Sequence, residues 1–363
     1  MKARIMSLFS MLCGIMGCTA QPKGYESVDV TEFDRIISDA DVVRLDVRTA
    51  DEYSDGHIDG AINIDIQQSD SFDSLATKTL PKDKTIAVYC RSGRRSKVAA
   101  ERLAGQGFKV VELSNGFNGW TGAGKSVTKD AVDMFLTDNG TIVRTYCIKH
   151  GTVRIQIGNK WIYVDPVTKA AQPVTDYSNM PKADIILITH EHGDHLDTQA
   201  ISQLMKSSTM PITNQRSNAQ LGGDGKSVVM KNGDHLTLAA PVRIKLEAVP
   251  AYNTGADKQQ FHPKGRDNGY IINIPAEAPG KAFRIYIAGD TEDIPELTDI
   301  KDIDIAFLPC NLPYTMSPEQ LVKAAKTVKP TVLFPYHYGQ TDMQQVVKML
   351  DGSGIDVRIR KYQ

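Results

Sequence analysis

The strongest constraint on this chain is a group of ionisable side chains directly behind one apolar segment. Residues 185–188 read IILI, which predicts a buried strand. Positions 190–195 read HEHGDH and so contain three imidazoles and two carboxylates. These ligands suit zinc, and to a lesser degree iron or manganese, and the stretch lacks the thiolates of closed structural sites. The sequence therefore predicts a catalytic metal site at the end of this strand.

The spacing H-x-H-x-D-H at positions 190–195 resembles the signature of the metallo-β-lactamase-fold hydrolases. The resemblance implies that His190 and His192 bind one metal ion, while Asp194 and His195 bind a second. Two ions are therefore expected, with one ion as the alternative, and the ligand types favour zinc while leaving manganese or iron open.

Two more ligands are expected from distant strands. The apolar segment 284–288 leads into Gly-Asp-Thr, where the resemblance makes Asp290 the bridging carboxylate. The segment 331–336 leads to His337, which would complete the second site. Each ligand follows the carboxyl end of a strand, where αβ folds place their sites.

The third histidine of the first site is expected near position 253, but the chain has Asn253 there. Three alternatives follow: the asparagine oxygen is a ligand, His262 takes its place, or only the second site is filled. His150 could line the cleft, while His235 is expected at the surface of a strand end. Cys310 follows a strand beside the site, as an accessible or a packed thiol.

The first eighteen residues predict a targeting segment. Lys2 and Arg4 precede the apolar stretch 5–16, which is too short to span a bilayer permanently. The following I-M-G-C resembles a bacterial lipobox, which implies that Cys18 is lipid-modified; an ordinary signal cleaved near Ala20 is the alternative. The lipobox implies a lipid-anchored protein of the bacterial cell envelope, on the periplasmic or outer-membrane side, with the membrane as a partner.

The composition of the chain after the targeting segment is typical of soluble globular domains. A length of 363 residues is enough for two domains, and the net charge of −1 predicts no nucleic-acid partner. Of the five cysteines, Cys13 and Cys18 fall in the targeting segment. The remaining three cannot pair evenly, so a disulfide framework is not expected.

Residues 22–126 are predicted to form a first domain with a reactive cysteine. The strand 85–89 is followed by CRSGRRS at positions 90–96 and then by a helical segment. This order places Cys90 among backbone N–H groups at a helix N-terminus, near Arg91, Arg94 and Arg95. Such a setting favours a thiolate and stabilises a bound anion. We therefore predict that Cys90 is a nucleophile.

Two chemistries use such a loop. Cysteine phosphatases need an arginine six positions after the cysteine, where this chain has Ser96. The loop instead resembles that of the rhodanese sulfurtransferases, and the stretch 45–64 supports this. The resemblance covers most of residues 25–122 and implies a persulfide on Cys90, an anionic sulfane-sulfur donor as partner, and a structural role for His57.

Residues 127–139 are predicted to link this domain to a second one at 140–363. Segments 141–148, 151–157 and 160–165 read as a strand meander, with Gly158-Asn159 as a two-residue turn. A strand pair is expected around Ser227 and His235, and a capped helix at 317–328. The expected fold class is α/β: a rhodanese-like α/β domain followed by a metallo-β-lactamase αββα sandwich.

Within that superfamily the chain is similar to the branch of ascorbate-phosphate lactonases and N-acyl-phosphatidylethanolamine phospholipases. Segments 150–153, 249–253, 289–291 and 335–339 carry this similarity. The chain does not resemble the glyoxalase-like branch with the persulfide dioxygenases.

Three functional hypotheses remain. The first is an exported bifunctional enzyme, in which a metal-bound hydroxide attacks an ester, lactone, amide or phosphodiester of a small molecule and Cys90 passes on sulfane sulfur. With a single ion, Asp194 would orient or deprotonate the water. The second is a sulfur-metabolism enzyme whose domains act on one persulfide or thioester. The third is a hydrolase regulated by a non-catalytic rhodanese-like sensor, against which the complete cysteine loop argues.

Overall fold

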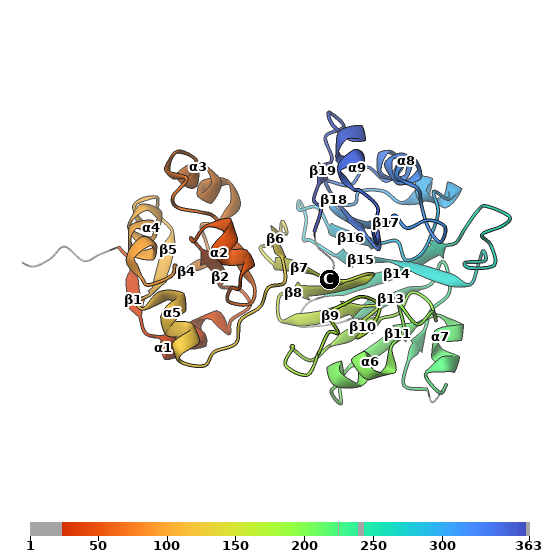
Figure 1. Ribbon diagram of the computed structural model, residues 1–363, viewed down its shortest axis with the longest axis horizontal. Helices are drawn as coiled ribbons and strands as arrows, with labels where there is room; N and C mark the ends of the chain where they lie inside the picture. The colour runs from red at the N-terminus through yellow and green to blue at the C-terminus, as the bar shows by residue number, and fades with distance from the viewer. Residues whose placement is uncertain (1–23, 224, 239–242, 361–363) are drawn as a thin grey trace, which may run out of the picture.

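The computed structural model describes residues 24–223, 225–238 and 243–360 (Figure 1). The predicted targeting segment, with Cys18 and Ala20, lies outside these residues. In the described part of the chain, no helix combines the length and the apolar composition of a membrane-spanning segment.

The N-terminal part is a parallel sheet covered by helices on both faces (Figure 1). Across residues 24–122 the sheet order is β1-β5-β4-β2-β3, and every adjacent pair is parallel. The strands are β1 (Glu26–Val28), β2 (Val43–Asp46), β3 (Ala61–Asn63), β4 (Thr85–Tyr89) and β5 (Lys109–Leu113). The helices are α1 (Val30–Ile37), α2 (Ala50–Ser54), α3 (Ser69–Thr79), α4 (Arg94–Gly105) and α5 (Gly116–Gly122).

Local sequence explains where these helices begin. The Asp29 side chain accepts a hydrogen bond from the Glu32 N–H and caps α1, while Thr49 and Glu52 form a capping box at α2. Helix α4 follows Gly93, whose φ of +90° is in the left-handed region. A Cβ at position 93 would lie 2.1 Å from the Ser114 carbonyl oxygen, so only glycine fits this turn.

The C-terminal part has two facing sheets. As far as the chain is described, each sheet has seven strands, in the orders β12-β11-β10-β9-β8-β7-β6 and β13-β14-β15-β16-β17-β18-β19. The first sheet contains β6 (Val132–Leu136), β7 (Ile142–Lys149), β8 (Thr152–Ile157), β9 (Lys160–Val164), β10 (Ile185–Leu187), β11 (Met210–Thr213) and β12 (Val228–Val229). The second contains β13 (His235–Leu238), β14 (Ile244–Ala251), β15 (Asp267–Ile274), β16 (Phe283–Ile287), β17 (Ile305–Pro309), β18 (Val332–Tyr336) and β19 (Asp356–Val357).

Helices cover the outer faces of the two sheets. Helices α6 (Thr198–Leu204) and α7 (Gln215–Gln220) lie beside the first sheet, and α8 (Pro318–Val328) and α9 (Gln344–Met349) beside the second (Figure 1). A short 3₁₀ turn, η1 (Pro295–Asp299), packs near α8. The predicted capping box of α8 is confirmed, because Ser317 and Gln320 bond each other's backbone N–H groups. The predicted fold class, including the αββα order, is confirmed.

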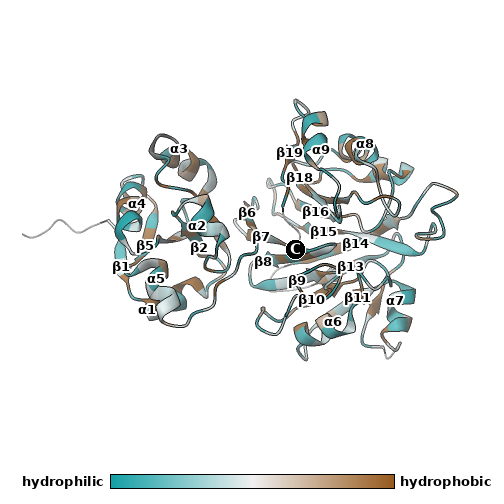
Figure 2. Ribbon diagram, in the orientation of Figure 1, coloured by the Kyte–Doolittle hydropathy of each residue, from teal (hydrophilic) through white to brown (hydrophobic). Residues whose placement is uncertain are grey.

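The main hydrophobic core lies between the two sheets. Apolar residues of both sheets, such as Ile155 and Leu187 from the first and Ile272 and Phe307 from the second, form one buried cluster. Figure 2 shows hydrophobic segments among these strands and hydrophilic residues along helices such as α4 and α7. Burial of this apolar area holds the sheets together and fixes the strand ends that carry the polar site.

Two predictions about strand pairing have different outcomes. The meander β7-β8-β9 is antiparallel as predicted, with Gly158 at a φ of +54° in the turn. The strand pair expected around Ser227 and His235 is wrong. Strand β12 pairs with β11 in the first sheet, while β13 pairs with β14 in the second. Side-chain packing in the core of each sheet determines which strands pair, so two extended segments that are neighbours in the sequence need not pair with each other.

Buried cations join the two parts of the chain. Arg144 donates hydrogen bonds to the carbonyl oxygens of Ala40 (3.1 Å) and Val42 (2.8 Å), and Arg154 pairs with Asp59 at 2.9 Å. Strand β6 lies within the segment 127–139 and adds an edge to the first sheet. The rhodanese-like part is therefore docked against the outer surface of β7 and β8.

Candidate functional site

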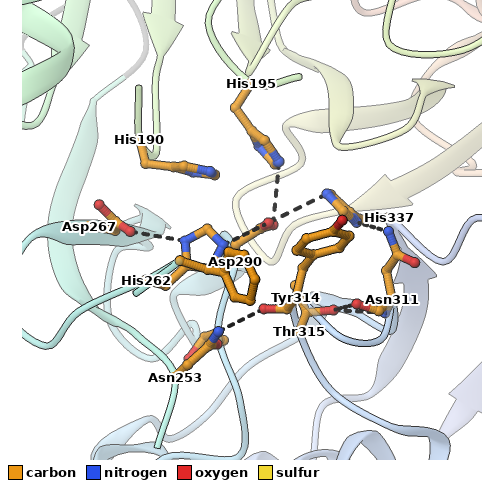
Figure 3. Close-up of polar contacts among 12 residues, drawn as sticks. His190, His195, Asn253, His262, Asp267, Asp290, Asn311, Tyr314, Thr315 and His337 are labelled. Carbon is orange, nitrogen blue, oxygen red and sulfur yellow. Dashed lines mark hydrogen bonds and ion pairs between the residues drawn. The ribbon is translucent and has the colours of Figure 1, made fainter. Parts of the chain in front are cut away.

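The residues of the predicted metal site meet at one end of the two sheets (Figure 3). The segment 190–195 follows β10, Asp290 follows β16 and His337 follows β18. Ligand atoms within 4.8 Å of one another fall into three groups among the described residues. The groups are His190, His192 and His262; His190, His195 and Asp290; and His150, Asp194, His195 and His337. The cluster thus has two halves with Asp290 beside both.

The first half contains His262 in place of the histidine expected near position 253. The ring of His262 lies 4.9 Å from the rings of both His190 and His192, measured between centroids. Its Nε2 atom lies 3.4 Å from Oδ2 of Asp290. The loop between β14 and β15 carries His262 into the cluster.

Asn253 has a different set of contacts. Its Nδ2 donates hydrogen bonds to the carbonyl oxygens of Lys258 (3.2 Å) and Tyr314 (2.9 Å), and its backbone N–H donates to the carbonyl oxygen of His262 (2.9 Å). Its Oδ1 atom is buried and has no hydrogen-bond partner among the described residues. Asn253 therefore braces the loop that presents His262.

The second half is built around Asp290. Its carboxylate oxygens lie 3.4 Å from Nε2 of His195 and 3.5 Å from Nε2 of His337. Oδ2 of Asp194 lies 3.8 Å from Nε2 of His195 and 3.6 Å from Nε2 of His337. Figure 3 shows the rings of His195 and His337 pointing toward Asp290.

Buried carboxylates contact the Nδ1 atoms of two histidines, on the side of each ring that faces away from the cluster. Nδ1 of His195 lies 2.8 Å from Oδ2 of Asp165, and Nδ1 of His262 lies 3.0 Å from Oδ2 of Asp267. A carboxylate on Nδ1 fixes the tautomer and turns Nε2 toward the cluster. Sequence spacing alone does not indicate a role for Asp165 or Asp267. The only signal was their position at strand boundaries, Asp165 directly after β9 and Asp267 at the start of β15.

The front of the cluster contains buried polar atoms without a hydrogen-bond partner among the described residues. They are Nε2 of His190, His195 and His337 and Oδ1 of Asp290. Buried polar groups are nearly always satisfied, so a group of unsatisfied ligand atoms that face one another fits a bound cation. Burial lowers the pKa of His190 well below its usual range and also lowers that of His192, which favours the neutral imidazole that metals bind.

The cysteine loop lies between β4 and α4, as predicted. Cys90 is 1% exposed, and Oγ of Ser96 lies 3.4 Å from its sulfur while donating a 2.7 Å hydrogen bond to Glu112. The Arg91 and Arg94 side chains are exposed. Arg95 is held by a two-pronged pair with Glu52 at 2.7 and 2.8 Å. The Glu52 hydrogen bond raises the pKa of Arg95, and Cys90 contributes in the same direction.

Three other residues singled out from the sequence are His57, His235 and Cys310. His57 is buried, exchanges two backbone hydrogen bonds with Thr128, and stacks on Tyr53 at 3.7 Å. His235 is exposed at the start of β13, as expected. Cys310 is fully buried in the second core cluster, and burial raises the pKa of its thiol to about 12. The packed alternative for Cys310 therefore fits the structure.

Comparisons with known proteins match both parts. The family described as Rhodanese-like domain matches residues 29–123, and the family described as Beta-lactamase superfamily domain matches residues 145–337. A UPF0173 metal-dependent hydrolase of Anoxybacillus flavithermus is 31% identical over 221 residues, which is 58% of this chain and 94% of the relative. A second one, from Thermus thermophilus, is 30% identical over 54% of this chain and 84% of the relative.

A solved structure is similar to the C-terminal part. It comes from Parabacteroides distasonis, is provisionally named a metal-dependent hydrolase, and is 49% identical, with a TM-score of 0.59. The match covers 64% of this chain and all of that one. The chain belongs to the beta-lactamase superfamily, among the UPF0173 metal-dependent hydrolases, and carries a rhodanese-like domain ahead of that part.

Proposed function

We propose that the chain is a metal-dependent hydrolase with a two-ion centre. The observation that carries this proposal is the set of buried, unpartnered ligand atoms that face one another in the cluster. In this proposal His190, His192 and His262 would hold one ion and Asp194, His195 and His337 would hold the other, with the Asp290 carboxylate near both sets of ligands. The donor set of imidazoles and carboxylates favours zinc; a single ion is the alternative, and manganese and iron also suit these ligands.

The chemistry follows from the donor set and from the side chains around it. When bound by these imidazoles and carboxylates, a metal ion would act as a Lewis acid and activate water as a nucleophile near neutral pH. Asp165 and Asp267 hold the protons on Nδ1 of His195 and His262, which leaves their Nε2 atoms free as ligands. With a single ion, Asp194, whose side chain is 43% exposed, would orient the water or accept a proton from it.

We propose an ester, a lactone or a phosphodiester of a small molecule as the substrate. The support is the similarity of segments 150–153, 249–253, 289–291 and 335–339 to the lactonase and phospholipase branch of the superfamily. All three bonds break by attack of an activated water on an electrophilic carbon or phosphorus, so one centre serves each of them.

We propose sulfurtransferase activity for the N-terminal domain. The Cys90 thiolate attacks the outer sulfur of a thiosulfate-type donor, an S–S bond forms on Cys90, and sulfite leaves with the electron pair of the broken bond. A nucleophilic acceptor then removes that sulfur and restores the thiolate. The exposed guanidinium groups of Arg91 and Arg94 can attract the anionic donor, and Arg95 holds the loop through Glu52.

Two other hypotheses link the domains differently. If both act on one persulfide or thioester, Cys90→Ser and His192→Ala will abolish the same reaction. If the first domain is a sensor, Cys90→Ser will change the regulation of hydrolysis while the wild type shows no sulfur transfer. Independent loss of one activity in each variant supports the bifunctional enzyme.

We also propose a lipid anchor on Cys18 and a place in the bacterial cell envelope. The support is the I-M-G-C motif behind a short basic and apolar segment. Labelling of cells with a radioactive fatty acid should mark the wild type and leave Cys18→Ala unlabelled. Label on both proteins, or on neither, would overturn the anchor.

The test of the hydrolase is metal content together with turnover. The full-length chain, His192→Ala and the surface control His235→Ala are reconstituted with zinc and assayed with bis-nitrophenyl phosphate and lactones. About two ions on the wild type and the control, with loss of metal and turnover in His192→Ala, support the proposal. One ion would indicate the single-ion alternative. No bound metal after reconstitution would overturn the hydrolase proposal.

A further inference from the structure

We infer that His150 positions two ligands of the second half of the cluster, Asp194 and His337, and thereby sets the affinity for the second ion. The inference rests on the proposed two-ion centre. It concerns a residue in the turn between β7 and β8, on a part of the fold that supplies none of the proposed ligands.

The side chain of His150 makes a hydrogen bond to one ligand. Its Nε2 lies 3.0 Å from Oδ2 of Asp194. The same oxygen lies 3.6 Å from Nε2 of His337 and 3.8 Å from Nε2 of His195. Separations of 3.6 Å and above are too long for hydrogen bonds, whereas 3.0 Å is an ordinary one. His150 therefore acts on Asp194 as a hydrogen-bond donor, while the longer distances leave room for an ion between ligands.

The backbone and ring of His150 hold the other ligand. Its carbonyl oxygen accepts a 3.1 Å hydrogen bond from the backbone N–H of His337. The two imidazole rings pack with their centroids 3.8 Å apart. One residue thus fixes the carboxylate of Asp194 through its side chain and the backbone of His337 through its own backbone.

The turn at positions 150–151 is shaped for this contact. His150 has a φ of +48°, in the left-handed region that non-glycine residues rarely adopt. A Cβ at Gly151 would lie 2.9 Å from Cε1 of His195, so the turn approaches a third ligand as closely as glycine allows. A strained residue that touches several ligands is expected where geometry matters for function.

Asp194 is the ligand on which a restraining hydrogen bond should have the largest effect. Its side chain is 43% exposed, whereas the side chains of His195, Asp290 and His337 are 3% exposed or less. An exposed carboxylate loses rotational freedom when it binds an ion. A hydrogen bond that holds it beforehand reduces that cost and strengthens ion binding.

The test measures the binding of each ion and not activity. The metal-free full-length chain is titrated with Co²⁺ in competition with a chromophoric chelator, and the visible absorption of Co²⁺ reports each step. His150→Asn tolerates the left-handed backbone but is too short to reach Asp194. His150→Gln places an N–H donor near the position of Nε2. His235→Asn is the matched control, because His235 is exposed in β13.

We expect two binding steps in the wild type and in His235→Asn. His150→Asn should weaken the second step by about 10- to 100-fold and leave the first step unchanged. His150→Gln should recover most of the lost affinity. The thermal unfolding of the metal-free proteins checks that each variant is folded.

Other outcomes would overturn the inference. Two unchanged steps in His150→Asn would overturn it while leaving the two-ion centre intact. Equal weakening of both steps would indicate a general structural role. A failure of His150→Gln to recover affinity would make His150 a ligand and not a positioning residue. A wild type that binds one ion or none would overturn the two-ion proposal together with this inference.

Discussion

Nδ1 of His195 lies 2.8 Å from Oδ2 of Asp165, and both side chains are completely buried. The same carboxylate accepts hydrogen bonds from the backbone N–H and the hydroxyl of Thr189, the residue directly before the segment 190–195. Asp165 therefore fixes both the ring of one proposed ligand and the start of the loop that carries four of them.

Asp165→Asn should lower metal affinity by about 10- to 100-fold, because the amide cannot accept all three hydrogen bonds and leaves the His195 ring poorly oriented. Competition with a chelator measures this loss. Asp34→Asn serves as the control, since Asp34 pairs with Lys125 in the other domain. Equal affinities of Asp165→Asn and the wild type would contradict an orienting role.

His262→Ala and Asn253→Ala should differ in their effects. His262→Ala removes a proposed ligand, so metal content should fall by about one ion. Asn253→Ala should keep the ions but lower the free energy of unfolding by about 1–3 kcal/mol, because the carbonyl oxygens of Lys258 and Tyr314 lose a donor. Elemental analysis and urea unfolding separate the two. If Asn253→Ala loses an ion while His262→Ala retains both, the assignment of His262 is wrong.

The ion pair between Glu52 and Arg95 predicts a pH dependence of stability. The hydrogen bond from Arg95 lowers the pKa of Glu52 to about 2, from an ordinary value of 4.5. A group with a lowered pKa stabilises the fold above its unfolded pKa and loses that contribution as the pH falls toward the folded value. The shift sets an upper limit of about 3 kcal/mol, which partial exposure reduces to about 1–2 kcal/mol.

Glu52→Gln should therefore be less stable than the wild type at pH 6, and the difference should shrink as the pH falls below about 4.5. Urea unfolding at several pH values measures it. Glu101→Gln is a matched control, because Glu101 is exposed on α4. A difference between Glu52→Gln and wild type that stays constant from pH 6 to pH 3 would rule out the ion pair as its source.

Arg154→Ala should destabilise the chain by about 2–3 kcal/mol, because Asp59 loses its partner; the 32% exposure of the Asp59 side chain lowers the cost from the about 3–5 kcal/mol of a fully buried pair. The guanidinium also lies 3.7 Å from the ring centroid of Tyr146, a contact that the variant loses. Arg35→Ala, which removes one partner of an exposed helix pair, should change stability much less. Denaturant unfolding followed by fluorescence compares them. Similar values for the two variants would mean that the domain contact contributes little.

The sequence predicted most of the metal cluster because all of its proposed ligands except His262 lie within a few residues of the end of an apolar strand. Asp290 and His337 are far from position 190 in sequence, but they follow β16 and β18, which end at the same edge as β10. Cys90 was predicted on the same basis, a strand followed by a turn and a helix. Where a functional residue lies at the end of a strand, a sequence pattern is sufficient to predict its position in the fold.

The remainder depends on contacts that sequence spacing does not reveal. His262 was only one of three alternatives, since the loop from 253 to 266 determines how far it reaches. The acceptors Asp165 and Asp267 could not be assigned, because their partners His195 and His262 meet them only after the sheets have assembled. Strands β12 and β13 were paired incorrectly because neighbouring segments can join opposite sheets.

The two buried arginines at the domain junction bear on how the chain can be divided. A fragment beginning near residue 140 would expose the guanidinium groups of Arg144 and Arg154, and would leave Tyr146, now fully buried, at a water-facing surface. A fragment ending near residue 126 would leave the carboxylate of Asp59 without its cation. Each half lacks what the other supplies, so the halves should unfold together in a single cooperative transition.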